Sequence, residues 1–265
     1  MIADLQLNSE REVVSENMVR GKVSVVGFGP GNKENMTFKA AQSIEGADIV
    51  IGYKAYIEIL KKFFPEKNFI SSHMMKEIER CREAIQEAVK GKNVAIVSSG
   101  DPGIYGMAGA IYQVAEDMQA DIDIEVVPGI TAASAAAAIL GAPLMHDLAI
   151  ISLSDLLTPF DLIMKRVEHA SMADMIICLY NPKSKKRVDH LEKATEIILE
   201  HRMPNTPVGI LRNIGRDGQQ KTITTLANLK NADVDMFSTV IIGNSQTYTF
   251  DDMMITPRGY AIGLE

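Results

Sequence analysis

Cysteine is scarce in this 265-residue sequence, which contains only Cys81 and Cys178. Two cysteines exclude the disulfide framework of a small secreted domain and a zinc site built from clustered thiolates. Both lie within apolar or helical patterns, where we expect buried thiols. The five histidines are scattered without the spacing of metal ligands, so we predict no metal site.

Long apolar runs and an excess of positive charge are absent as well. No run approaches the ~18 residues needed to cross a bilayer, and residues 1–20 form a polar extension unlike a secretory signal. We therefore expect a cytoplasmic protein without a membrane partner. The formal net charge of −7 opposes a general polyanion-binding surface, so we also expect no nucleic acid partner.

The sequence does contain a regular alternation of short apolar runs and helical patterns. Runs such as KVSVVGFG and NVAIVSSG are separated by amphipathic stretches such as residues 74–91. This alternation predicts an α/β fold with mainly parallel or mixed sheets covered by helices. In residues 74–91 the expected buried face carries Met75, Ile78, Ile85 and Val89.

The segment GAPLMHD, residues 141–147, interrupts the alternation, which then starts again. We therefore predict an N-terminal α/β domain over residues 21–138 and a C-terminal α/β domain over residues 139–265. Because ligand pockets favour domain interfaces, we expect a cofactor cleft between the two domains.

Glycine-rich turns follow the predicted strands, where open α/β sheets bind ligands. GFGPG at residues 27–31 lacks the spacing of a dinucleotide fingerprint, and no Gly-Lys-Ser/Thr follows it as in a phosphate-binding loop. SSGDPGIYG at residues 98–106 has more glycines than a helix cap requires, although Asp101-Pro102 alone would suit a helix start. VPGITAAS at residues 127–134 allows either close helix packing or room for a nucleoside. The alternative to ligand binding at each turn is tight packing.

Polar side chains mark the strand ends of the predicted C-terminal domain. Loop capping would explain them as well as ligand binding does. The basic run in NPKSKKR is either a solvated loop or a carboxylate-binding surface. Three arginines further along the chain either bind carboxylates through their guanidinium groups or pair with surface acids such as Asp217 and Asp251. These residues are Tyr180, Asn181, Arg212, Asn213 and Asn244 at strand ends, Lys183, Lys185, Lys186 and Arg187 in the run, and Arg212, Arg216 and Arg258.

Together the turns resemble those of the tetrapyrrole (corrin/porphyrin) methylase family over residues 22–260. The resemblance implies two α/β domains with S-adenosyl-L-methionine in the cleft between them. Carried over position by position, it implies cofactor contacts at Pro30, Ser99, Gly100, Asp101, Ile104, Thr131, Ala132, Tyr180 and Asn213.

The segments GIYGMAG, HDLAIISLSDLLTPFD, YNPKSKKR and TPVGILRNIGRDGQ are similar to a narrower branch of that family. Members of this branch methylate carbon 17 of a corrin precursor, precorrin-3B or cobalt-factor III, and contract the ring to (cobalt-)precorrin-4 in cobalamin biosynthesis. The resemblance thus implies a tetrapyrrole substrate, with or without cobalt, and a homodimer. Phe160 is a departure, because a tryptophan is expected there.

Methyl transfer needs alignment more than a nucleophile, whereas ring contraction needs proton transfers. The candidate acid–base residues are Asp101, His146, Asp155 and Tyr180. The expected substrate contacts are Gly29, Gly31, Lys183, Lys185, Lys186, Arg187, Arg212 and Arg258. The alternatives are a methylase acting on another corrin carbon, on a protein or on ribosomal RNA, and a non-catalytic cofactor-binding protein.

Overall fold

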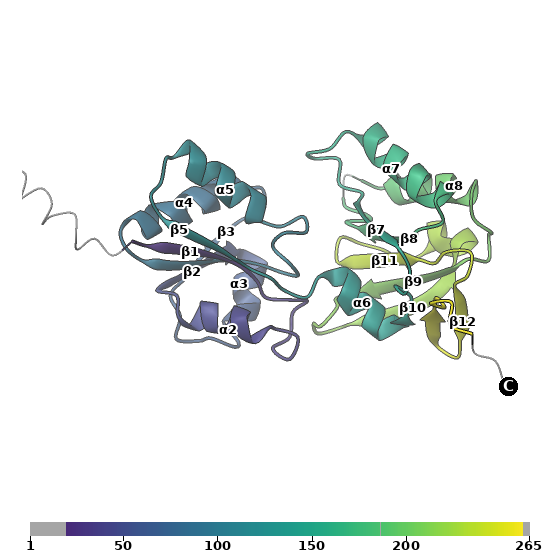
Figure 1. Cartoon of the computed structure of the whole chain (residues 1–265), viewed down its shortest axis with the longest axis horizontal. Helices are drawn as coiled ribbons and strands as arrows, with labels where there is room; N and C mark the ends of the chain where they lie inside the picture. Colours follow the sequence, from purple (N-terminus) through teal and green to yellow (C-terminus); the bar gives the residue numbers. More distant parts are fainter. Residues whose placement is uncertain (1–19, 186, 262–265) are drawn as a thin grey trace, which may run out of the picture. The chain divides into compact units, whose positions relative to one another are not determined.

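The computed structural model describes residues 20–185 and 187–261. The predicted polar extension, except for Arg20, and Lys186 of the basic run lie outside the described residues. The chain divides into two compact units, residues 1–130 and 131–265 (Figure 1). Both units combine a five-stranded sheet with helices, which confirms the predicted α/β class.

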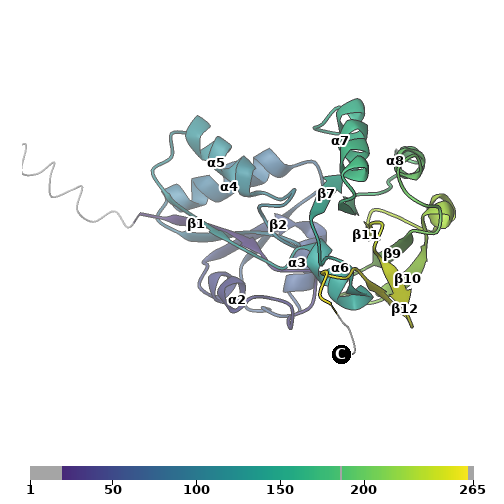
Figure 2. The ribbon, with the colours of Figure 1, turned by 45° about the vertical axis from the view of Figure 1, so that its right-hand side comes forward.

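The first unit is built on an entirely parallel sheet with strand order β3-β2-β4-β1-β5. Its strands are β1 (Lys22–Gly27), β2 (Ile49–Tyr53), β3 (Phe69–Ser72), β4 (Asn93–Ser98) and β5 (Asp123–Val127). Its helices are α2 (Phe38–Glu45), α3 (Lys54–Leu60), α4 (Glu77–Val89) and α5 (Ala108–Asp117). Helices α4 and α5 cover one face of the sheet, and α2 and α3 cover the other (Figure 2).

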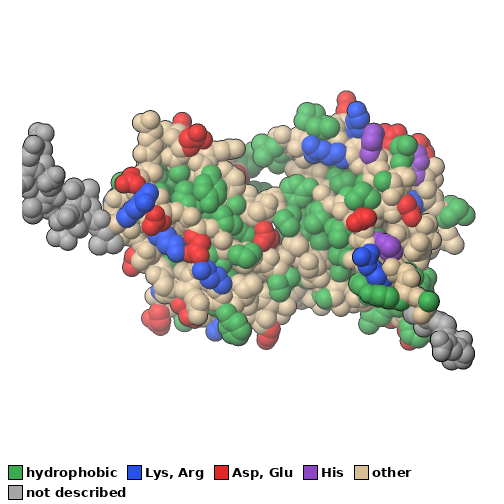
Figure 3. Space-filling view, in the orientation of Figure 1, with side chains coloured by type: hydrophobic (Ala, Val, Ile, Leu, Met, Phe, Trp, Pro, Cys, Tyr) green, Lys and Arg blue, Asp and Glu red, His purple; other side chains and the backbone are tan. Residues whose placement is uncertain are grey.

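Alternation along β1 explains why both faces are covered. Val23 and Val25 belong to the apolar cluster under α4 and α5, whereas Val26 belongs to the cluster under α2 and α3. Side chains of a strand point to opposite faces in turn, so an almost continuously apolar strand needs a layer on each side. On the face of the molecule in Figure 3, acidic and basic side chains are interspersed over this unit.

The buried face of α4 differs from the predicted one. Met75 precedes the helix, and Ile78 and Val89 are exposed, whereas Ile85 is buried as expected. The residues of α4 that face the core still follow the 3.6-residue period, but most of them are small. Small side chains allow the helix to pack closely on the sheet and on α5. They are Cys81, Ala84, Ile85 and Ala88.

The second unit contains a mixed sheet with strand order β10-β9-β11-β8-β7. Its strands are β7 (Leu148–Ser152), β8 (Ile176–Tyr180), β9 (Pro207–Arg212), β10 (Gln220–Thr225) and β11 (Ser238–Ile242). The helices α7 (Phe160–Met172) and α8 (His190–Leu199) and the 3-10 helix η1 (Leu226–Asn231) contribute to one apolar cluster, and α6 (Ala132–Leu140) contributes to another. A small sheet joins β6 (Gly141–Ala142), β12 (Tyr248–Phe250) and β13 (Met253–Ile255).

The position of α6 moves the boundary between the units from the predicted 138/139 to 130/131. Ala133, Ala136 and Leu140 are buried in one cluster with Cys178 and Leu211 of the second sheet. The helix therefore packs with the second unit, although it follows the last strand of the first. Cys81 and Cys178 are both buried free thiols, as predicted.

None of the described helices is long and apolar enough to cross a membrane. Within the described residues, no three His, Cys, Asp or Glu side chains gather in a group that could hold a metal ion.

Candidate functional site

The glycine-rich turns of the first unit meet at one edge of its sheet. All five strands are parallel, so the turns after β1, β4 and β5 share the edge formed by the carboxyl ends. Gly29 and Gly100 are joined by two backbone hydrogen bonds, of 3.2 Å from Gly29 N and 2.8 Å from Gly100 N. The structure therefore brings residues 27–31 and 98–106 into direct contact.

Asp101 connects the turn after β4 to the turn after β5. Its Oδ1 accepts a hydrogen bond from Gly103 N at 2.8 Å, and its Oδ2 accepts one from Gly129 N at 3.1 Å. The helix cap that was the alternative explanation for Asp101-Pro102 does not form, because α5 begins only at Ala108. Gly103 and Gly106 disfavour a helix there, and the backbone of Tyr105 is left-handed with φ of 55°.

Glycine is required where these turns touch. A Cβ at Gly129 would lie 2.2 Å from the carbonyl oxygen of Gly100 and 2.4 Å from that of Gly27. These atoms belong to the backbone and cannot move aside as a flexible side chain can. The three turns therefore pack at the closest separation that a main chain allows.

One polar atom at this edge lacks a partner. Ser98 is the last residue of β4, is 6% exposed, and its buried Oγ makes no hydrogen bond to the residues that the structure describes. A buried hydroxyl without a partner is costly, which favours a ligand or a water molecule at this edge. Of the other predicted contacts, Pro30 and Gly31 are buried, and Ser99, Gly100 and Ile104 are half-buried.

The second unit has its own polar edge, formed by the ends of β7, β8 and β9. Ser152 pairs with Tyr180 in the parallel register of β7 and β8, and β11 brings Arg212 of β9 to the same edge. Asn181 and Asn213 directly follow β8 and β9 and share a left-handed backbone with φ of 52°.

Tyr180 holds the first turn of α6. Its hydroxyl lies 2.6 Å from Thr131 Oγ1 and accepts a hydrogen bond of 2.6 Å from Ala133 N. An unpaired helix N–H is thereby satisfied by a phenol from the neighbouring strand. The predicted cofactor residues Thr131, Ala132 and Tyr180 are thus brought together at the start of α6. Asn213 lies at the same edge of the sheet, and its side-chain Nδ2 donates a hydrogen bond of 3.4 Å to Gly218 O.

Asp155 belongs to the same edge and lies beside His190, a histidine that no sequence motif singles out. Nε2 of His190 lies 3.1 Å from Asp155 Oδ2, and Nδ1 lies 3.1 Å from Asp189 Oδ1. The contact with His190 lowers the pKa of the Asp155 carboxyl. A carboxylate with a lowered pKa is a weaker base, which disfavours Asp155 as the proton acceptor.

Arg212 does not stand free as a carboxylate fork. Its Nη2 lies 2.7 Å from Asp235 and its Nη1 lies 3.4 Å from Asp233, rather than from the Asp217 or Asp251 considered from the sequence. In the basic run, Lys183 is half-buried and Lys185 is exposed, whereas Nε of Arg187 is buried without a hydrogen bond to the described residues. Arg187 is therefore the member of the run best placed to gain from an anionic partner.

His146 lies at the opposite edge of the second sheet. It precedes the start of β7 and lines a cavity of about 480 Å³ with Asp174, Met175 and Asn244. A strand of five residues separates the two edges by ~13 Å, so His146 is not brought together with Tyr180. Arg258 follows Thr256, which is tied to this edge through Thr247 and Pro143.

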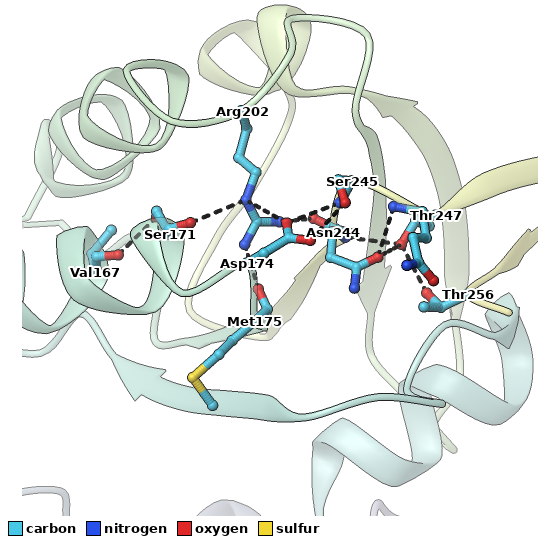
Figure 4. A network of polar contacts seen from close by, with 11 residues as sticks. Val167, Ser171, Asp174, Met175, Arg202, Asn244, Ser245, Thr247 and Thr256 are labelled. Atoms are coloured by element: carbon cyan, nitrogen blue, oxygen red, sulfur yellow. Dashed lines mark hydrogen bonds and ion pairs between the residues drawn. The ribbon is translucent and has the colours of Figure 1, made fainter. Parts of the chain in front are cut away.

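A buried arginine organises that opposite edge (Figure 4). Arg202 donates hydrogen bonds to the carbonyl oxygens of Gly243, at 2.5 Å, and Met175, at 2.6 Å, and Nε lies 3.4 Å from Asp174. Asp174 in turn accepts hydrogen bonds from the backbone and hydroxyl of Ser245. Every polar group of Arg202 is used by neighbouring chain segments, which indicates a structural role for this edge.

The fold and the contact of three glycine-rich turns are features by which a protein family can be recognised. Comparison with known families identifies that family. The model of the Tetrapyrrole (Corrin/Porphyrin) Methylases matches residues 22–230, so the chain belongs to this family, as its motifs predicted.

Among its relatives, the probable cobalt-factor III C(17)-methyltransferase of Salmonella typhimurium strain LT2 is 47% identical over 91% of this chain and 100% of its own length. The cobalt-factor III methyltransferase of Priestia megaterium is 44% identical over 91% of this chain, which spans 46% of that longer protein. The crystal structure of the methyltransferase CobJ superposes with a TM-score of 0.83 at 33% identity, covering 89% of this chain and 100% of that one.

Proposed function

We propose that this chain is an S-adenosylmethionine-dependent C-methyltransferase of cobalamin biosynthesis. It would methylate carbon 17 of cobalt-factor III or precorrin-3B and contract the macrocycle to the corresponding precorrin-4. The names of the relatives support the substrate, and the arrangement that carries the proposal is the joining of three glycine-rich turns at one edge of the first sheet.

The residues at that edge fit the cofactor. The Ser98 hydroxyl is buried without a partner among the described residues. Gly103 has no side chain, so a ligand could contact the main chain there directly. Pro30, Ser99, Gly100, Asp101 and Ile104 would hold the cofactor in this unit, and Thr131, Ala132, Tyr180 and Asn213 in the other. When bound, S-adenosylmethionine supplies the methyl group of a sulfonium.

The contribution of the chain to methyl transfer would be positioning. Aligning two reactants and excluding water can lower a barrier by ~7–11 kcal/mol without a dedicated nucleophile. Turns fixed by the Gly29–Gly100 bonds and by Asp101 are suited to this task, since each is held by another turn.

Ring contraction additionally requires proton transfers. Of the predicted acid–base residues, Asp101 already accepts two backbone hydrogen bonds, and His146 lies at the edge opposite to Tyr180. We retain Tyr180 as the candidate, because its hydroxyl lies at the polar edge beside Thr131. Lys183, Arg187 and, beyond its acidic partners, Arg212 would meet substrate carboxylates, with Lys185 and Lys186 in the same run.

The proposal includes a homodimer and a cytoplasmic location. The homodimer comes from the resemblance to the family, and the cytoplasmic location comes from the composition of the sequence. Light scattering of the purified protein at several concentrations tests the first, and a monomer throughout that range would contradict it.

The test is mass spectrometry of the product formed from cobalt-factor III and from precorrin-3B, supplied separately with labelled S-adenosylmethionine. We expect one labelled methyl group and the mass of the ring-contracted product from at least one of the two. Tight cofactor binding without turnover of either macrocycle would instead favour a non-catalytic binding protein. A labelled product with the methyl group on another carbon would favour a different corrin methylase.

A further inference from the structure

The connection between β7 and α7, residues 153–159, is attached firmly to the polar edge of the second unit. Leu153 N donates a hydrogen bond of 2.9 Å to Tyr180 O, and Ser154 N donates one of 3.2 Å to Ser152 Oγ. Ser152 Oγ also accepts a hydrogen bond of 3.0 Å from Asn181 Nδ2. The base of the loop is thereby joined to the residues that follow β8.

His190 of α8 contacts the same loop at two further points, and its buried Nε2 makes no hydrogen bond to the described residues. Its Nε2 lies 3.1 Å from Asp155 in the middle of the loop, and its ring packs edge-on against Phe160 at the loop's end, with centroids 4.7 Å apart. His190 is only 9% exposed and is held from its other side by Asp189. A nearly buried imidazole thus joins a loop to a helix that begins 35 residues further along the chain.

The tip of this anchored loop presents two adjacent apolar side chains to solvent. Leu156 is 66% exposed and Leu157 is 99% exposed. The loop projects from the second unit ahead of α7 (Figure 1). Single exposed leucines are common on protein surfaces, but an adjacent pair on a loop with three anchors is held away from the core, which marks it as a contact surface.

Charges beside the loop indicate what that surface would contact. Arg187 lies close enough to Asp155 to influence its carboxyl electrostatically, and its buried Nε makes no hydrogen bond to described residues. Lys183 precedes Arg187 in the connection between β8 and α8. An apolar tip next to cations is complementary to a broad, flat apolar ring with carboxylates on its rim.

We propose that residues 153–159 form an apolar platform for one face of the macrocycle, and that His190 is a positioning residue which holds this platform through Asp155 and Phe160. The inference rests on the proposed function, because it assigns a surface to that substrate. Leu156 and Leu157 would contact the ring, and Arg187 a rim carboxylate. None of these contacts involves the glycine-rich turns of the first unit.

Replacing Leu157 with Ser tests the platform directly, because a fully exposed side chain adds no packing to the folded chain. We expect KM for cobalt-factor III to rise by about tenfold, with the melting temperature, the oligomeric state and the cofactor Kd unchanged. The matched control is Met203→Ser. Met203 is also apolar and 69% exposed, but it lies between the end of α8 and the start of β9, at the other end of β9 from Arg212. An unchanged KM in Leu157→Ser, or a change of oligomeric state, would overturn the proposal.

The role of His190 is tested by His190→Ala, His190→Gln and the double variant with Leu157→Ser. We expect KM to rise in His190→Ala and to recover in part in His190→Gln, whose amide can still reach Asp155, while kcat stays within about twofold. Because His190 acts through the loop, its removal should add little once Leu157 is gone. Fully additive effects on KM would contradict this. If His190→Ala does not fold, the Gln and Leu157 variants still decide the question.

The outcome also separates this inference from the proposed function. Lack of turnover of cobalt-factor III and precorrin-3B by the unmodified protein would reject the function itself. Turnover by the unmodified protein with an unaffected Leu157→Ser variant would reject the platform alone.

Discussion

At the scale of single residues, Asp101 shows how one side chain can hold two turns together. Each of its carboxylate oxygens accepts a backbone N–H, one from its own turn and one from the turn after β5. Such charge-assisted hydrogen bonds are stronger than neutral ones. The residue therefore determines how closely the turns after β4 and β5 approach one another.

Replacing Asp101 with Ala should remove both bonds and loosen the two turns. We expect loss of cofactor affinity by at least tenfold in calorimetry, with a decrease of about 2 kcal/mol in the free energy of unfolding, since two hydrogen bonds to a charged group are lost. Asp101→Asn should retain part of the affinity, because its one carbonyl oxygen can still accept from Gly129 or Gly103. Equal cofactor affinity in Asp101→Ala and the unmodified protein would reduce Asp101 to a local turn residue.

The lowered pKa of the Asp189 carboxyl leads to a second prediction for a single residue. Lys193 first, and His190 second, lower its pKa from 3.8 to about 2. A carboxyl whose folded pKa is lowered contributes stability above its unfolded pKa and loses that contribution as the pH falls through the folded value. We therefore expect its NMR titration midpoint near pH 2. Lys193→Met should move the midpoint upward more than His190→Gln does, and a reversed order would contradict the assignment of cause.

The glycines at 29 and 100 predicted a main chain that approaches a ligand. The structure shows these turns and Gly129 approaching one another, and the approach to a ligand stays a prediction. The role of His190 could not be found this way, because its partner Asp155 lies 35 positions earlier and only the packing of α7 and α8 brings them together. The acids that pair with Arg212 were missed for the same reason.

At the scale of elements, the buried strands were predictable and the polar ones were not. β1, β4, β8 and β11 are apolar over most of their length because both faces are covered. β10, with the sequence QKTITT, is the outermost strand of the second sheet, and none of its residues is fully buried. Its polar composition is typical of a loop. Its β-branched Thr-Ile-Thr-Thr run was the signal that remained.

The contact of three turns gives a prediction at the scale of elements. Gly129→Ala places a methyl group against the carbonyl oxygens of Gly27 and Gly100, so the turns must separate. We expect a loss of about 2 kcal/mol or more in the free energy of unfolding and loss of cofactor binding by calorimetry.

Gly109→Ala is the matched control for that variant. Gly109 lies within α5, and an added Cβ would meet no atom within 4 Å. Alanine favours a helix over glycine by roughly 0.5–1 kcal/mol, so this variant should be as stable as the unmodified protein or more so, with normal cofactor affinity. If Gly129→Ala behaves like Gly109→Ala, the close contact of the turns has no part in binding.

At the scale of the whole molecule, the division into two units depends on where α6 packs. The sequence placed the boundary after the Ala-rich helix, because the alternation of strands and helices breaks only at GAPLMHD. Packing decides otherwise, since the buried face of α6 lies against β8, β9 and β11 of the second sheet. Periodicity shows that a helix has an apolar face but does not show which sheet that face covers.

Two fragments of the C-terminal half distinguish these boundaries. A fragment of residues 131–265 keeps Ala133, Ala136 and Leu140 on the cluster that contains Cys178 and Leu211. A fragment of residues 139–265 keeps Leu140 but lacks Ala133, Ala136 and the rest of the helix before residue 139, so it exposes much of the sheet face that α6 covers. Each large apolar side chain of the sheet that becomes fully exposed costs about 1.5–3 kcal/mol, which is a large share of the stability of a marginally stable unit. We therefore expect cooperative thermal unfolding of the longer fragment and no unfolding transition in the shorter one, measured by circular dichroism. Equal stability of the two fragments would contradict the assignment of α6 to the second unit.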